Sequence, residues 1–514
     1  MRATITPRPS PGASRRAATA RMSALATLAV ASQAALVASP APLVASASPM
    51  AASPAAATQA ALAASPAAAL QAPAADTLRA PPVLQDRHPS PDTVEVVLAA
   101  RPARLSLLPG KETDLYTYGG TFPGPTLDVD EGDHVIVRFR NELPEATTIH
   151  WHGLHLPFDA DGSPFHPVPP GGEYTYAFTV PVGTAGTYWY HPHPMHDTTW
   201  QIGKGLLGAV IVRAEDDPLP DMTERLLILS DNRFHEDGSL SFPEPGTRQA
   251  RIDEQNGREG DALFVNGQIE PVIPIAPGEV QRWRVINASG ARVYRVAVPG
   301  HTLIHVGSDG GLFEIPVERE DILLANTERA EVLVRGVGES GSEVAVEDRP
   351  YDRYRPLTRP RDWDRTRTLA TLRYGTEPGQ GVETPDRLRE VPALREEDAS
   401  AVRVLRLDQG RINGQTMDMG RVDLRAELGA TEVWEIRNLV GMDHPFHLHG
   451  FRFQVLSRNG EPAPYRSWKD TVNVPARETV RFIVRFDDYP GKWMFHCHIV
   501  DHEDMGMMGV LEVG

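Results

Sequence analysis

The sequence predicts an all-β protein built from β-sandwich domains, and three observations support this prediction. The chain has 514 residues, which is enough for about three domains. Glycine and proline are abundant, with 43 and 46 residues, whereas runs with the period of an amphipathic helix are scarce. Short runs of alternating apolar and polar residues recur between turn-forming segments, as is typical of sandwich strands.

The N-terminal part differs from the rest because it is rich in Ala, Ser and Pro. The pair Arg15-Arg16 precedes a modestly apolar run, so we expect an export signal over residues 1–47. It resembles the twin-arginine type, although Ala17 replaces the bulky residue that usually follows the pair. A disordered arm is the alternative. Residues 48–84 then form an Ala/Ser/Pro linker. The apolar run is mostly alanine, so we expect no stable membrane span.

One sequence unit occurs three times in the remainder of the chain. Each unit has a glycine nine residues before a closing asparagine: Gly132 before Asn141, Gly278 before Asn287, and Gly429 before Asn438. Each ends in an alternating apolar run that we predict to be a β-strand, at 135–139, 283–285 and 433–436.

Histidine pairs follow the first and third units at matching distances. Nine residues after the closing asparagine, the first unit reaches His150 and the third reaches His447, whereas the second reaches Val296. Gly186 and Gly491 each precede a second histidine pair by five residues. In a strand, residues two apart share one face, so each pair presents two imidazoles together. The outer units therefore predict a metal cluster in the cleft between them.

The only cysteine, Cys497, lies between His496 and His498. In an extended strand the two histidines share one face and the thiol lies on the other, so one tripeptide can serve two metal sites. A thiolate, two imidazoles and a weak axial thioether form the ligand set of a blue electron-transfer copper. His502 and Met507 follow in the same segment. The first unit has Pro192 at the equivalent position, so only the third can build this site.

The net charge of −17 argues against nucleic acid as a partner and favours a soluble secreted protein. A single cysteine excludes an intramolecular disulfide, but it does not exclude export, because a bound metal would cap the thiol. We therefore expect the protein to be exported, to the periplasm or the extracellular space.

Taken together, the motifs resemble those of the multicopper oxidases, specifically the three-domain laccase-like branch. The resemblance covers about residues 85–514. It implies three cupredoxin-like (plastocyanin-like) Greek-key β-sandwiches, of which the middle one is copper-free. With the repeats, it suggests domains at 85–215, 216–348 and 399–514, and a linker at 349–398.

The resemblance also implies four copper ions and their ligands. The type 1 copper would be bound by His444, Cys497 and His502, with Met507 as the axial ligand. The type 2 copper would be bound by His150 and His447. The two type 3 coppers would be bound by His152, His191, His193, His449, His496 and His498.

The implied reaction is the one-electron oxidation of phenols or aromatic amines, coupled to the four-electron reduction of dioxygen to water. Glu503 and Asp161 resemble carboxylates that supply protons in the family, although either could be a solvated loop residue or an orienting group. A metal oxidase acting on Cu(I), Fe(II) or Mn(II) is the alternative, but the stretch 349–398 lacks the methionines of the cuprous-oxidase branch. A non-catalytic copper-binding protein is a third reading. The complete ligand set argues against it.

Overall fold

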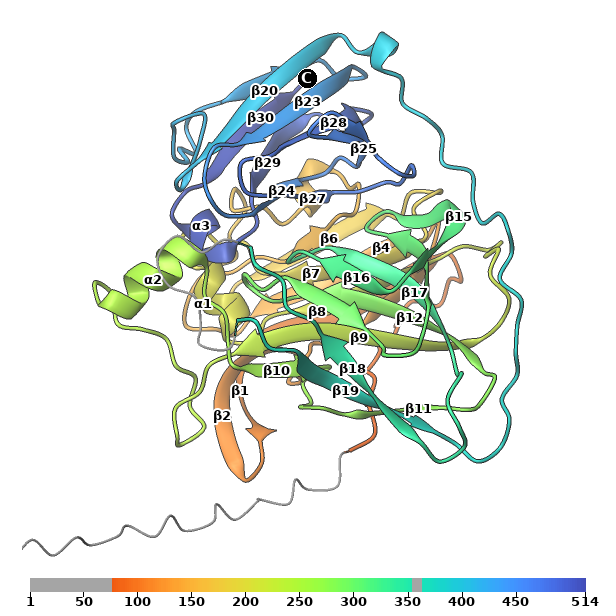
Figure 1. The fold of residues 1–514 in the computed structure, drawn as a ribbon. Coiled ribbons are helices and arrows are strands. Elements are labelled where there is room, and N and C mark those ends of the chain that lie inside the picture. Colours follow the sequence, from red (N-terminus) through yellow and green to blue (C-terminus); the bar gives the residue numbers. More distant parts are fainter. Residues whose placement is uncertain (1–75, 354–362) are drawn as a thin grey trace, which may run out of the picture. The chain divides into compact units, whose positions relative to one another are not determined.

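The structure is a computed structural model that describes residues 76–353 and 363–514. The predicted export signal and most of the predicted 48–84 linker lie outside the described residues. Hydrogen bonds group the described strands into six sheets, which form three β-sandwiches in chain order (Figure 1). Among the described residues, no helix combines the length and apolar character that a membrane span requires.

The first sandwich comprises two four-stranded sheets. Its strands are β1 (Thr93–Leu108), β2 (Lys111–Tyr118), β3 (Leu127–Asp130), β4 (His134–Asn141), β5 (His150–His152), β6 (Glu173–Thr179), β7 (Gly186–His191) and β8 (Gly208–Arg213). The sheet orders are β2-β1-β4-β6 and β3-β8-β7-β5. β1 pairs in parallel with β4, which comes three strands later, so the chain crosses between the sheets as in a Greek key. In β4, Val135, Val137 and Phe139 are buried, as the alternating pattern predicts.

The second sandwich has a six-stranded and a five-stranded sheet. Its strands are β9 (Thr223–Asn232), β10 (Ala262–Val265), β11 (Val272–Ile275), β12 (Val280–Asn287), β13 (Tyr294–Ala297), β14 (Leu303–Ser308), β15 (Gly311–Arg319), β16 (Asp321–Leu324), β17 (Arg329–Arg335), β18 (Glu343–Asp348) and β19 (Arg367–Tyr374). The orders are β10-β9-β12-β17-β14-β15 and β11-β19-β18-β13-β16.

The third sandwich repeats this plan. Its strands are β20 (Ala401–Asp408), β21 (Arg411–Ile412), β22 (Leu424–Ala426), β23 (Thr431–Asn438), β24 (His444–Leu448), β25 (Phe453–Arg458), β26 (Glu461–Pro462), β27 (Thr471–Val474), β28 (Thr479–Arg485), β29 (Gly491–Cys497) and β30 (Met508–Val513). The orders are β21-β20-β23-β28-β25-β26 and β22-β30-β29-β24-β27. The strand β20 pairs in parallel with β23, just as β1 pairs with β4.

The described residues also contain several short helices. They are the 3-10 turns η1 (Phe158–Ala160) and η2 (Glu396–Asp398) and the α-helices α1 (Thr198–Gly203), α2 (Arg248–Asn256) and α3 (Val500–Asp504). The helix α2 begins with a capped turn, in which the Thr247 hydroxyl accepts the N–H of Ala250.

Two segments that the sequence predicted to be linkers contain residues that pair through the backbone with other parts of the chain. Residues 367–374 form β19, which pairs with β18 and β11 because Leu369, Leu372 and Tyr374 are buried in the second core. The predicted linker at 349–398 is therefore wrong for these residues. In the first linker, Leu78 donates its N–H to the carbonyl of Val272, and Val83 bridges to Thr126.

The asparagines that close the three repeats make the same kind of hydrogen bonds between their side chains and the main chain. Each side-chain amide donates to main-chain carbonyls of the loops that follow: Asn141 to Glu145 and Val168, Asn287 to Arg292 and Leu324, and Asn438 to Met442, Val474 and Pro475. Each side-chain oxygen accepts the main-chain N–H two residues further on, at 2.9–3.1 Å. The repeated asparagine thus fixes the loop that, in the outer domains, leads to the first histidine pair.

Substitution of Asn287 tests this role in the domain without copper motifs. Asn287→Leu removes three hydrogen bonds and leaves buried main-chain groups unpaired, so we expect a loss of about 3–5 kcal/mol in the free energy of unfolding. The measurement is urea unfolding followed by circular dichroism. Val402→Thr, at a side chain that is 63% exposed, is the control. A loss below about 1 kcal/mol for Asn287→Leu would show that the loop is held by other contacts.

Candidate metal centre

Four strands, with the residues that directly follow them, carry the eight histidines of the predicted type 2 and type 3 sites, and the strands form two equivalent pairs. In the first domain β5 pairs with β7 so that His150 lies opposite His191. In the third domain β24 pairs with β29 so that His447 lies opposite His496. The two outer domains thus present their histidines in the same register, as the sequence spacing predicts. Gly162 permits a close approach behind β5, because a β-carbon there would lie 1.7 Å from the carbonyl oxygen of Ile149.

The structure gathers histidines from both outer domains into one buried cluster. Three groups have ring nitrogens within 4.8 Å of one another: His150 with His152 and His191, His150 with His447 and His449, and His193 with His449 and His496. His498 joins them, with its ring centroid 5.0 Å from that of His152 and 5.2 Å from that of His191. The eight predicted type 2 and type 3 ligands therefore lie together.

The outer nitrogens of these rings are held by oxygen acceptors. His150 Nδ1 donates to the carbonyl of Asp161 at 2.8 Å, His447 Nδ1 to that of Asp470 at 2.9 Å, and His496 Nδ1 to that of Cys497 at 3.1 Å. A carbonyl can only accept, so the proton of each neutral ring lies on Nδ1 and Nε2 carries a lone pair. Hydrogen-bond partners of a ligating histidine set its tautomer in this way.

The inner nitrogens of these rings face one another. His496 Nε2 lies 3.0 Å from His449 Nε2 and 3.3 Å from His193 Nε2. The Nε2 atoms of His150 and His447 are buried and have no hydrogen-bond partner among the described residues. Nitrogens that each lie about 2.0–2.1 Å from one ion at a tetrahedral angle are about 3.3 Å apart. The residues therefore fit bound metal ions.

Burial keeps these histidines neutral. The pKa of every ring in the cluster lies below its ordinary value, chiefly because burial penalises the charged form. For every ring except His150, neighbouring rings lower it further because they repel a proton. The pKa of His150 falls to about 4 and that of His496 to about 3. The rings thus remain available as metal ligands at neutral pH and below.

A second site lies around the cysteine. Cys497 Sγ is 3.3 Å from His444 Nδ1 and 3.7 Å from His502 Nδ1, and all three side chains are buried. Burial raises the pKa of the Cys497 thiol to about 12, so binding of a metal would have to displace its proton. Met507 is also buried, and its carbonyl accepts the N–H of Cys497 at 3.1 Å.

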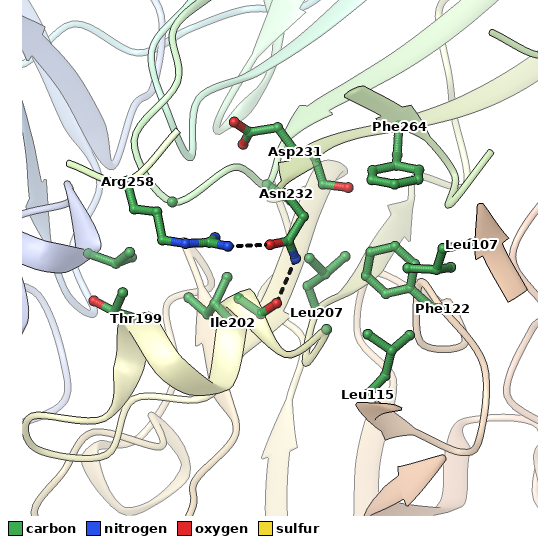
Figure 2. A pocket seen from close by; sticks show the side chains of 16 residues that line it. Leu107, Leu115, Phe122, Thr199, Ile202, Leu207, Asp231, Asn232, Arg258 and Phe264 are labelled. Carbon is green, nitrogen blue, oxygen red and sulfur yellow. Dashed lines mark hydrogen bonds between the residues drawn. The ribbon is translucent and has the colours of Figure 1, made fainter. Parts of the chain in front are cut away.

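The helix α3, which carries His502 and Glu503, is tied to both other domains. Asp504 accepts the N–H groups of Thr198 and Thr199 at the start of α1, at 3.0 and 2.8 Å. Asp501 accepts the N–H of Arg258 at 2.7 Å. Figure 2 shows the neighbouring contact, in which Asn232 accepts from Arg258 and donates to the carbonyl of Gly203, beside a cavity of 30 Å³.

Both predicted carboxylates lie at the histidine cluster. An Asp161 carboxyl oxygen lies 3.0 Å from His449 Nδ1, and the other lies 3.5 Å from His150 Nδ1. The Glu503 oxygens lie 3.5 Å from His193 Nδ1 and 3.4 Å from His496 Nδ1. Burial raises the pKa of Asp161 to about 8 and that of Glu503 well above its ordinary value.

Sequence reasoning missed a third carboxylate, Asp470. Its Oδ1 lies 2.9 Å from His152 Nε2, and its carbonyl accepts from His447. The neighbouring Thr471 hydroxyl lies 3.2 Å from ring nitrogens of both histidines. The available signal was a polar pair at the start of an apolar strand, but only the pairing of His447 with Thr471 shows where that strand lies.

The comparisons with known proteins agree with this geometry. Family models described as "Multicopper oxidase" match residues 100–217, 233–376 and 390–514. A multicopper oxidase of Staphylococcus haemolyticus is 31% identical, over 77% of this chain and 83% of that protein. The laccase of Bacillus subtilis is 29% identical, over 78% and 90%. A solved Campylobacter jejuni multicopper oxidase, described as a metallo-oxidase, superposes with a TM-score of 0.79 and 35% identity, over 86% and 96%.

The three matched segments cover most of the chain, and the structural likeness extends over all three sandwiches. Relatives of this kind are copper-containing oxidoreductases that act on oxygen. The chain belongs to the multicopper oxidase family.

Proposed function

We propose that this protein couples the one-electron oxidation of phenols and aromatic amines to the four-electron reduction of dioxygen to water, using four copper ions. The observation that carries the proposal is the continuity of the two sites. The tripeptide from His496 to His498 contributes imidazoles to the histidine cluster and, between them, the thiol to the second site. An electron accepted at the thiol site is therefore one residue away from the cluster, on either side of Cys497.

The donor sets divide the copper ions between the sites. The type 1 copper would lie with His444, Cys497 and His502, and Met507 would be its axial ligand. The type 2 copper would lie with His150 and His447. The type 3 pair would lie with His152, His191, His193, His449, His496 and His498. Bound there, copper supplies one-electron transfer at the thiol site and dioxygen binding at the cluster.

A cavity of 490 Å³ beside the thiol site suits a small reducing substrate. His444 and His502 both line it, but their outer nitrogens differ. His502 Nε2 lies 3.3 Å from the carbonyl of Gln255 in α2, whereas His444 Nε2 has no hydrogen-bond partner among the described residues. Both histidines are buried, so we propose that the phenol or aromatic amine contacts the cavity lining beside these rings. Arg411 and Arg477 also line the cavity and would favour a phenolate.

The cavity also admits a metal ion as reductant, because the thioethers of Met442 and Met505 and the carboxylate of Glu254 line it. Soft thioethers suit Cu(I). The Campylobacter jejuni relative is described as a metallo-oxidase. Oxidation of Cu(I), Fe(II) or Mn(II) is thus the second candidate activity. Comparing these metal ions with phenols and aromatic amines as electron donors distinguishes it from the first.

We also propose that residues 1–47 direct export to the periplasm or the extracellular space, on the basis of the Arg15-Arg16 pair and the apolar run that follows it. Copper loading before export is compatible with such a signal. The domain boundaries at 85–215, 216–348 and 399–514 are part of this proposal, except that the second domain includes β19.

The donor cavity can be narrowed at Gly441. A β-carbon there meets nothing within 4 Å, and the backbone is not in the left-handed region, so Gly441→Leu extends into the cavity without strain. Loss of about 1–2 kcal/mol of contact should raise KM for a phenol roughly tenfold while the visible absorption of the thiol site is unchanged. The measurement is oxygen uptake with a phenol, an aromatic diamine, Cu(I), Fe(II) and Mn(II) as parallel donors.

Gly375→Leu is the matched control, because Gly375 lies in the middle domain. A β-carbon at Gly375 would make only an ordinary van der Waals contact, 3.9 Å from the carbonyl oxygen of Ile275. A phenol KM that stays unchanged in Gly441→Leu would remove the cavity from the donor path. A kcat/KM for one of the metal ions far above that for the phenol and the diamine would favour the metal-oxidase activity.

Removal of the thiol tests the electron path. Cys497→Ser should abolish the blue colour and the oxidase activity, because a hydroxyl cannot replace the thiolate, while most copper of the histidine cluster stays bound. Copper analysis and visible absorption check both points. Blue colour that persists in Cys497→Ser would contradict the assignment of the thiol site.

Proton supply is tested at the two carboxyl groups. Burial raises the pKa of Glu503 well above its ordinary value and so favours the protonated carboxyl, whose oxygens lie 3.4–3.5 Å from Nδ1 of His193 and His496. Glu503→Gln should leave reduction by the donor almost unchanged and slow reoxidation by dioxygen about 10²–10⁴-fold. Stopped-flow absorbance separates the half-reactions. Asp161→Asn should slow the same half-reaction, without additivity if both serve one water chain. Full reoxidation rates in Glu503→Gln would return that residue to a structural role.

A further inference from the structure

The middle domain offers no ligand, yet one of its turns reaches the histidine cluster. We propose that residues 326–329, the turn between β16 and β17, position the imidazoles of the cluster from outside. Arg329 acts through Asp470, and Thr327 acts through Thr471. This inference rests on the four-copper assignment of the proposed function.

Arg329 holds the carboxylate that holds His152. Its guanidinium donates to both oxygens of Asp470, with Nη1 2.9 Å from Oδ1 and Nη2 close to Oδ2. The same Oδ1 lies 2.9 Å from His152 Nε2. A two-pronged contact of this kind fixes the plane of a carboxylate. Asp470 then accepts the Nε2 proton of His152 and leaves the lone pair on Nδ1, which points at His191 Nε2 from 3.4 Å.

The remaining donors of Arg329 connect the three domains. Nε donates to the carbonyl of Thr187 in β7 of the first domain at 3.1 Å, and Nη2 donates to the carbonyl of Asp309 in the second domain at 3.0 Å. Asp470 belongs to the third domain. Arg329 is fully buried, and Lys469 lies 2.9 Å from Asp309, so the buried charges are paired. A buried cation that contacts every domain fixes the carboxylate relative to all the ligand strands.

Thr327 forms a second chain of hydrogen bonds from the middle domain to the histidine cluster. Its hydroxyl lies 3.0 Å from that of Thr471, which in turn lies 3.2 Å from His447 Nδ1 and from His152 Nε2. Thr327 has a φ of 73°, a left-handed conformation that is uncommon for a β-branched residue. Such conformations persist where the surroundings over-determine them, often at functional sites. The adjacent Asn326 donates to the carbonyl of His498.

The alternative is a purely structural role, in which these contacts only stabilise the association of the domains. Arg282 is the matched residue for that role, because it is also buried and pairs with Glu331 of β17 at 2.5 Å and with Asp217. Within the described residues, Arg282 makes no hydrogen bond or ion pair with a predicted ligand or with a residue that contacts one. Positioning predicts different behaviour for Arg329 and Arg282, whereas simple stabilisation predicts the same.

The experiment compares copper binding in Thr327→Val, Arg329→Gln and Arg282→Gln of the full chain, with Thr327→Ser as the conservative variant. Each protein is titrated with copper at fixed free concentrations. The readouts are copper bound per chain, the visible absorption of the thiol site, the paramagnetic resonance signal of type 2 copper, and the melting temperature.

We expect Thr327→Val and Arg329→Gln to bind copper at the cluster about 10–100-fold more weakly and to show an altered type 2 signal, with the blue absorption retained. Thr327→Ser should restore the native signal because it keeps the hydroxyl. Arg282→Gln should lower the melting temperature without this change. Native affinity and signal in Thr327→Val and in any folded Arg329→Gln, or the same loss in Arg282→Gln, would overturn the inference. A native protein without cluster copper would instead contradict the proposed function.

Discussion

Buried imidazole nitrogens that carry lone pairs and face one another are the constraint on which the rest of the structure depends. A buried polar atom without a partner costs free energy, and most folded proteins pair nearly all of them. Here His449 and His496 place Nε2 atoms 3.0 Å apart, and burial keeps both rings neutral. A bound cation satisfies such an arrangement, because each ring can direct a lone pair at it. The ring protons are held outward by carbonyls and carboxylates, so the surrounding frame determines where the lone pairs point.

The need for this surrounding frame explains why the protein has three sandwiches although the ligands come from only two of them. The outer domains supply equivalent strand pairs, β5 with β7 and β24 with β29, whose register sets four histidines each. The helix α3 is fixed by contacts to the first and middle domains, which places His502 and Glu503. The middle domain supplies buried polar side chains instead of ligands. The turn at 326–329 links it to the cluster through the hydrogen bonds of Asn326, Thr327 and Arg329.

The gathering of the histidine pairs and the all-β architecture were predictable from the sequence because both follow from short-range periodicity. Histidines two residues apart share a strand face, and the spacing from Asn141 to His150 recurs from Asn438 to His447. Asp470 and Arg329 were not predictable, because their roles depend on contacts between residues 318 and 141 positions apart. The strand β19 was missed because its charged and proline-rich surroundings resemble a linker, although the strand buries Leu369 and Leu372.

Anomalous X-ray scattering at the copper absorption edge, from crystals of the copper-loaded protein, tests the central claim most directly. The account predicts four copper peaks in each molecule. One should lie among His444, Cys497 and His502, and three should lie inside the cluster of eight histidines, on the sides that bear the Nε2 atoms of His150 and His447. A cluster with no copper, or with one ion bound through the Nδ1 atoms that contact carbonyls, would contradict the lone-pair assignment and the proposed reaction together.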